Sequence, residues 1–83
     1  MSQDEYIQSV IQRAREAVCN AHPKERFECL HDACFSIGCL VKQDMLTWDQ
    51  GVSYCKDIAR AAGFFPETIE SKLVLYLKDG HSF

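Results

Sequence analysis

Eighty-three residues, 47% of them hydrophobic and 25% charged, have the composition of one globular domain with a single core. This composition excludes intrinsically disordered and fibrous proteins. Nine Lys and Arg residues against 12 Asp and Glu residues leave a net charge of −3, which removes the long-range electrostatic steering that strong nucleic-acid binders use.

The first predicted helix begins after Ser2 and ends before Pro23. Ser2-Gln3-Asp4-Glu5 has the pattern of a capping box, in which the serine oxygen accepts a hydrogen bond from the amide of Glu5. Apolar residues then recur at helical spacing and predict one buried stripe: Ile7, Val10, Ile11, Ala14, Ala17 and Val18. Pro23 suits the first position of the next helix, because its missing N–H leaves no donor unpaired there.

The second predicted helix runs from about residue 23 to residue 42 and carries the most apolar stretch of the chain. Residues 33–41 are apolar nearly all the way round a helix, and Ser36 interrupts them. A helix that is apolar on every side is buried on every side, so we expect it to be the central helix. Gly38 costs about 1 kcal/mol of helix propensity relative to alanine, and we expect a close crossing with another helix to compensate.

The third predicted helix begins with a second capping box, formed by Thr47 and Gln50. Gly63 ends this helix in the left-handed conformation that glycine tolerates. Its predicted buried face comprises Val52, Cys55, Ile58, Ala59 and Ala62.

The fourth predicted helix starts at Pro66 and stops at Gly80. Its apolar stripe comprises Ile69, Leu73, Tyr76 and Leu77. The loops between the four helices are short, as antiparallel neighbours require. The sequence therefore predicts an all-α, compact, four-helix bundle-like single domain over residues 1–83.

Five cysteines lie at positions 19, 29, 34, 39 and 55, and this spacing favours neither a disulfide framework nor a metal site. We interpret them as small, buried, reduced apolar residues, with no metal or cofactor. The longest apolar run is much shorter than the roughly 20 residues that span a bilayer. The polar, acidic start from Met1 to Glu5 is also unlike a signal peptide. We expect a cytoplasmic protein that does not contact a membrane.

The sequence contains no motif that predicts catalysis. Its histidines, at positions 22, 31 and 81, are scattered over a loop, a helix and the C-terminal tail. A glycine-rich phosphate loop, an H-E-x-x-H motif and a nucleophile elbow are all missing. We expect no enzymatic activity and assign no catalytic residue.

Two sets of charged residues are candidates for binding a macromolecule. Glu25, Glu28 and Asp32 form an acidic line along one edge of the second helix, which could meet a basic protein surface or imitate phosphates; the ordinary alternative is a solvated helix edge. A modest basic patch that could contact nucleic-acid phosphates is formed by Lys56, Arg60 and Lys72. The alternative, which we favour, is that these bases form a solvated face with Asp57 and Glu70.

Trp48, Phe64 and Phe65 are candidates for an aromatic binding surface. Phe64 and Phe65 lie between Gly63 and Pro66, where loops are normally polar and exposed. Aromatic residues also dominate binding hot spots. The alternative is that the three rings seal the ends of a small core, and we favour this slightly for Phe64.

A line in the second helix, Leu30-His-Asp-Ala33-Cys-Phe35-Ser-Ile37-Gly38-Cys-Leu40-Val41, resembles the L-x-x-A-x-F-x-L-G-x-L-V line of a known helical domain. That domain follows the catalytic core in primase-polymerases of phages and plasmids. The resemblance continues at Leu46, in residues 59–64, similar to A-x-A-A-G-L, and in residues 68–73, similar to T-I-x-S-G-L. It covers residues 26–80. Lys72 replaces a glycine of that pattern, and this chain has fewer basic residues than is usual in that domain. No primase catalytic domain is present.

The resemblance implies the helical fold and a mobile-element origin, without primase activity. We therefore expect a non-enzymatic protein of a phage or other mobile element that contacts a protein or protein–nucleic-acid complex. Such a protein would modulate or inhibit a replication complex or a host defence complex. The alternative is a replication accessory module that binds nucleic acid directly through the basic patch. A self-associating structural subunit is a third class.

Overall fold

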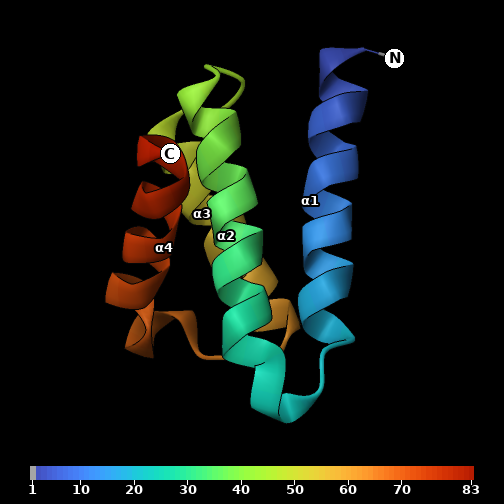
Figure 1. The fold of residues 1–83 in the computed structure, drawn as a ribbon, viewed down its shortest axis with the longest axis vertical. Helices are drawn as coiled ribbons and strands as arrows, with labels where there is room; N and C mark the ends of the chain where they lie inside the picture. The colour runs from blue at the N-terminus through green and yellow to red at the C-terminus, as the bar shows by residue number, and fades with distance from the viewer. Residues whose placement is uncertain (1) are drawn as a thin grey trace.

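In the computed structural model, residues 2–83 are described, and they form an all-α fold without β-strands (Figure 1). The four α-helices are α1 (Gln3–Cys19), α2 (Arg26–Lys42), α3 (Trp48–Ala61) and α4 (Glu70–Ser82). Two short 3-10 helices, η1 (Pro23–Glu25) and η2 (Pro66–Thr68), precede α2 and α4. Met1, which the predicted domain and N-terminal segment include, lies outside the described residues. The predicted all-α class is confirmed.

Capping hydrogen bonds at two N-termini and a left-handed glycine at one C-terminus set three of the predicted helix boundaries. The hydroxyl of Ser2 accepts a hydrogen bond from the amide of Glu5 at 3.2 Å. At the start of α3, the amide of Gln50 donates to the Thr47 hydroxyl at 3.1 Å, and the amide of Thr47 donates to the Gln50 side chain at 2.9 Å. Gly63 has a φ of 92°, in the left-handed region. These three boundaries are confirmed.

Three predicted boundaries differ from the structure. Pro23 and Pro66 each begin a 3-10 turn, so α2 starts at Arg26 and α4 starts at Glu70. Gly80 does not stop its helix, because α4 continues to Ser82 with Gly80 buried inside it. The glycine lies where the backbones of α2 and α4 approach closely.

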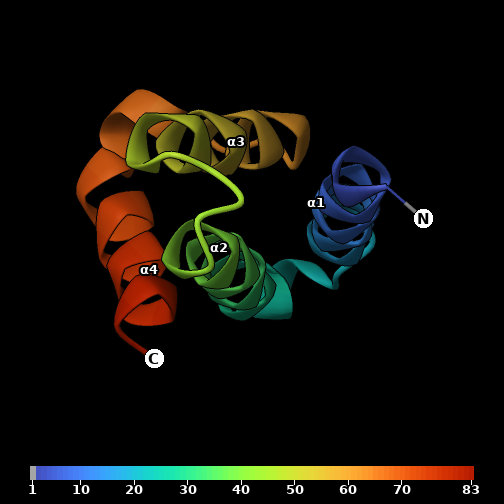
Figure 2. The same cartoon turned by 90° about the horizontal axis from the view of Figure 1, so that it is seen from above.

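The α2 helix is central, as predicted. Seen from above, α1 and α4 lie on opposite sides of α2, and α3 lies along a third side (Figure 2). The buried residues of α2 are Leu30, Ala33, Cys34, Ile37, Gly38, Leu40 and Val41. A narrow strip that includes Asp32 and Ser36 stays exposed. The helix is therefore covered on three sides and open on one.

The close crossing predicted at Gly38 joins α2 to α4 and is confirmed. A Cβ atom placed on Gly38 would lie 2.8 Å from the backbone nitrogen of His81 and 2.9 Å from the Cα of Gly80, and it would be closer still to the carbonyl oxygen of Leu77. A Cβ atom on Gly80 would lie 2.8 Å from the carbonyl carbon of Phe35. The two glycines thus let the two backbones touch.

The cysteines divide by their place in the fold. All five are free thiols, but Cys34 and Cys55 alone are fully buried; Cys29 and Cys39 are half-buried and Cys19 is exposed. A hydrogen bond with the Cys34 side chain, together with burial, raises the pKa of the Cys55 thiol far above its ordinary value. Between residues 2 and 83, no three His, Cys, Asp or Glu side chains are grouped as metal ligands. The expectation of mostly buried thiols therefore holds for the α2–α3 pair and not for Cys19.

None of the helices in residues 2–83 is both long enough and apolar enough to cross a membrane. The apolar residues instead face the shared core, where Ile11, Ile37, Ile58 and Leu77 are almost completely buried.

Candidate functional site

The basic residues of α3 are engaged with acids of the same chain. Lys56 forms an ion pair with Glu70 at 2.6 Å. Arg60 lies 3.4 Å from a carboxylate oxygen of Asp57 and 3.8 Å from one of Glu67. Lys56 is thus paired with α4, and Arg60 with α3 and η2, in agreement with the solvated charged face that the sequence favoured.

The third base, Lys72, belongs to an aromatic cluster at the N-terminal end of α2. Its ammonium nitrogen lies 4.9 Å from the centre of the Phe27 ring, within the range of a cation–π interaction. Phe27 in turn packs on Phe64, with ring centres 4.7 Å apart. Phe64 is half-buried in this contact, so it seals one end of the core, as the favoured interpretation for this residue predicted.

Trp48, Phe64 and Phe65 do not form one surface. Trp48 is the first residue of α3, whereas Phe64 and Phe65 follow its last turn, so they lie at opposite ends of that helix. A helix of this length separates them by roughly 20 Å. Trp48 packs edge-on against His81, with ring centres 5.9 Å apart. Phe65 is 74% exposed. The predicted aromatic surface is therefore reduced to Phe65 with its half-buried neighbour.

Replacing Phe65 with alanine is expected to change the free energy of unfolding by no more than about 0.5 kcal/mol, because most of its ring is already in water. The Thr68 hydroxyl donates a hydrogen bond to the backbone carbonyl of Phe65, and the substitution keeps this hydrogen bond because it changes only the side chain. Thermal unfolding followed by circular dichroism measures the effect. Phe64→Ala is the matched control and should cost more, since it removes the contact with Phe27. A Phe65→Ala variant that loses as much stability as Phe64→Ala would place Phe65 in the core.

The acidic line is exposed along its whole length. Glu25 ends η1, and Glu28 and Asp32 follow on the open strip of α2. Among the described residues, no basic nitrogen lies within 4.0 Å of the carboxylates of Glu25 or Glu28. Asp32 faces Nδ1 of His31 at 3.6 Å. The carboxylates of this acidic line are therefore largely accessible from outside.

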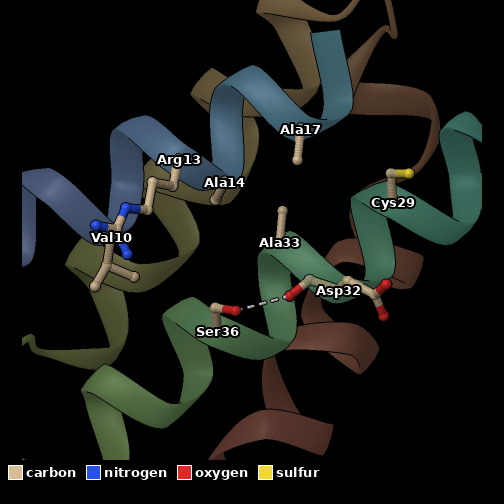
Figure 3. Close-up of a pocket in the computed structure, with 8 residues that line it drawn as sticks. All are labelled: Val10, Arg13, Ala14, Ala17, Cys29, Asp32, Ala33 and Ser36. Carbon is tan, nitrogen blue, oxygen red and sulfur yellow. Dashed lines mark hydrogen bonds between the residues drawn. The ribbon is translucent and has the colours of Figure 1, made fainter. Parts of the chain in front are cut away.

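A groove lies beside the acidic line, between α1 and α2 (Figure 3). Its volume is about 350 Å³. Figure 3 shows Ala17 of α1 and Ala33 of α2 pointing toward each other across it. The other small or apolar lining residues are Val10, Ala14, Cys29 and Ser36. Small side chains on both facing helix edges leave this space unfilled.

The two rims of the groove carry opposite charges. Arg13 lines it on the α1 side, and Asp32 lines it on the α2 side (Figure 3). The Ser36 hydroxyl donates to the backbone carbonyl of Asp32 at 3.1 Å, beneath the rim. Asp32 thus belongs to both the acidic line and the groove. Sequence reasoning missed the groove, although alanines on the facing edges of the first two helices were a signal for it.

His31 is a second feature that the sequence did not indicate. Its Nε2 atom lies 3.3 Å from a carboxylate oxygen of Asp79, and its Nδ1 atom faces Asp32. The imidazole also packs edge-on against the Tyr76 ring, with centres 4.7 Å apart. Both ring nitrogens therefore face carboxylates, and the side chain joins α2 to α4.

Comparisons with known proteins give no match, whether to a protein-family model, to a curated protein or to a solved structure. The resemblance to the helical domain of primase-polymerases therefore stays a prediction from the sequence. The candidate site rests on the geometry of α1 and α2.

Proposed function

We propose that this chain is a non-enzymatic binding protein that contacts a basic surface of a macromolecular complex through Glu25, Glu28 and Asp32. One observation supports this proposal above the others. The acidic line is open to solvent, whereas Lys56 and Arg60 are paired with carboxylates of the same chain. The carboxylates of the acidic line are therefore accessible to a partner, whereas the two bases of α3 are already engaged.

Electrostatics favours a basic partner over a nucleic acid. A nucleic acid is bound chiefly by Lys and Arg side chains that neutralise its phosphates. Here Lys56 would have to leave Glu70 first, and the nearby carboxylates would repel the phosphates. A net charge of −3 adds to that repulsion at long range. An exposed Lys or Arg of a partner protein could contact Glu25 or Glu28 without first breaking an ion pair of this chain.

The resemblance to the primase-polymerase helical domain supports a mobile-element setting for this binding. Complexes that handle nucleic acids carry basic surfaces for phosphate contacts. A small acidic protein that occupied such a surface would compete with the nucleic acid, and would so modulate or inhibit the complex. The partner we propose is therefore a replication complex or a host defence complex with an exposed basic surface.

Charge reversal of the acidic line is expected to disrupt the complex. Each exposed ion pair contributes about 0.2–1 kcal/mol, and reversal also adds repulsion, so a variant with Glu25, Glu28 and Asp32 all changed to Lys should bind at least about tenfold more weakly. The partner is first captured with the tagged protein, identified by mass spectrometry and purified. Its dissociation constant is then measured for each variant.

The matched control replaces the three bases, Lys56, Arg60 and Lys72, with alanine, and this variant should bind the partner nearly as the parent does. The alternative, direct nucleic-acid binding, makes the opposite prediction. The free protein would then bind a short oligonucleotide, and affinity would fall by about 0.7–0.9 log units per log unit of salt for each phosphate contact. Loss of that binding in the alanine variant would contradict our proposal.

A further inference from the structure

We propose that the α1–α2 groove is the apolar half of the same binding face, and that it accepts an apolar side chain from a basic segment of the partner protein. This inference rests on the proposed function, because it takes the partner to be a basic protein. It adds a second kind of contact to the acidic line and defines the chemistry of the segment: an apolar anchor with Lys or Arg beside it.

The groove is apolar surface that the fold leaves uncovered. Ile11 and Val18 of α1 are buried in the core and hold the helix in place. Ala17 belongs to the same apolar stripe but is exposed, and Val10 is half-buried. The stripe of α1 is thus wider than the part that α2 and α3 cover. The remainder, Val10 and Ala17, lines the groove.

The volume of the groove leaves room for an apolar side chain. Small-molecule and cofactor pockets in proteins measure about 300–1,000 Å³, and this groove, at about 350 Å³, lies at the lower end. Its floor is made of alanine side chains from both helices, with the Ser36 hydroxyl already donating to a backbone carbonyl. The floor therefore offers apolar contact, and the charged groups are confined to the rims.

The charges on the rims define how the segment lies. Asp32 is on the α2 rim, and Glu28 is one helical turn before it on the same exposed strip. Arg13 is on the α1 rim and repels a cation there. A segment with its apolar side chain in the groove would therefore place its Lys or Arg residues toward α2. This complementarity favours a basic amphipathic segment over an acidic one or over a second copy of this acidic chain.

A defined peptide tests the inference without knowledge of the natural partner. The probe is a synthetic helical peptide of Lys, Gln and Ala with two leucines one turn apart. Two control peptides replace either the leucines with serine or the lysines with glutamate. Affinity is measured by fluorescence anisotropy, and the contact surface is mapped by amide chemical shifts of the full chain. We expect the leucine–lysine peptide to shift Val10, Ala14 and Ala33, and both control peptides to bind more weakly.

Filling the groove separates it from the acidic line. Ala17→Leu places a larger side chain in the groove from an exposed helical position, and it leaves every charge unchanged. Loss of one buried anchor should weaken peptide binding by about tenfold. Ala61→Leu is the matched control, since Ala61 is an exposed alanine of α3 outside the groove, and it should bind as the parent does. Ser36→Leu fills the groove from α2 and serves as a second, independent variant.

The outcomes distinguish this inference from the proposed function. If charge reversal of the acidic line weakens binding but both groove-filling variants bind normally, the proposed function stands and the groove inference is wrong. If the serine peptide binds as tightly as the leucine–lysine peptide, the groove inference is likewise wrong. If neither set of variants matters, or if the peptide does not bind at millimolar concentration, the groove inference is wrong. Concentration-dependent self-association in sedimentation that Ala17→Leu abolishes would assign the groove to a second copy and overturn it.

Discussion

Replacing Gly38 with leucine is expected to destabilise the protein by about 3 kcal/mol or more, at or above the upper end of the range for overpacked cores. The atoms that a new Cβ would meet belong to the α4 backbone at Leu77, Gly80 and His81. A backbone cannot rotate away as a side chain can, so α2 and α4 must separate. Because whole domains are stable by only about 5–15 kcal/mol, this change removes a large part of the stability. Urea unfolding followed by circular dichroism measures it.

A series of glycine variants provides the control. Gly38→Ala should still destabilise, although alanine favours a helix by about 1 kcal/mol over glycine. Gly51→Ala should cost less, because its new Cβ would meet side-chain atoms, 2.9 Å from Val41 and 3.4 Å from Leu77, and these can move. A Gly38→Leu variant as stable as the parent would show that α2 and α4 do not touch at this position.

Truncating Leu77 to alanine is the second large expected effect, at about 2–5 kcal/mol of lost stability. Leu77 is completely buried in α4. Its carbonyl lies against Gly38 of α2, and its methyl groups lie against Gly51 of α3. The side chain therefore fills the junction of three helices, and its removal leaves a cavity that rigid backbones cannot close.

Leu75→Ala is the matched control for this truncation. Leu75 lies on the same helix and loses the same atoms, but it is 55% exposed. Its substitution should change stability by no more than about 0.5 kcal/mol. Equal losses in the two variants, measured by the same urea unfolding, would mean that α4 does not pack through its Leu77 face.

The candidate site could be predicted from the sequence only in part. The exposed acidic line follows from the helical spacing of Glu28 and Asp32 on a helix whose other faces are apolar. The groove beside it depends on the distance between α1 and α2, and the spacing of residues within one helix does not determine that distance. The separation of Trp48 from Phe65 could have been predicted, because the length of the helix between them is readable from its cap and its terminating glycine.

The sequence by itself determined the features that depend on neighbours within a few residues. The caps at Ser2 and Thr47 and the left-handed turn at Gly63 are local hydrogen-bonding and backbone preferences, and the apolar run of the second helix requires burial whatever surrounds it. Only the tertiary structure decided that Gly80 continues a helix instead of ending one, since a close backbone approach from α2 occupies the space of its side chain. It likewise decided that Lys56 pairs with Glu70. Contacts between helices depend on their register and separation, which many residues set together and no single motif encodes.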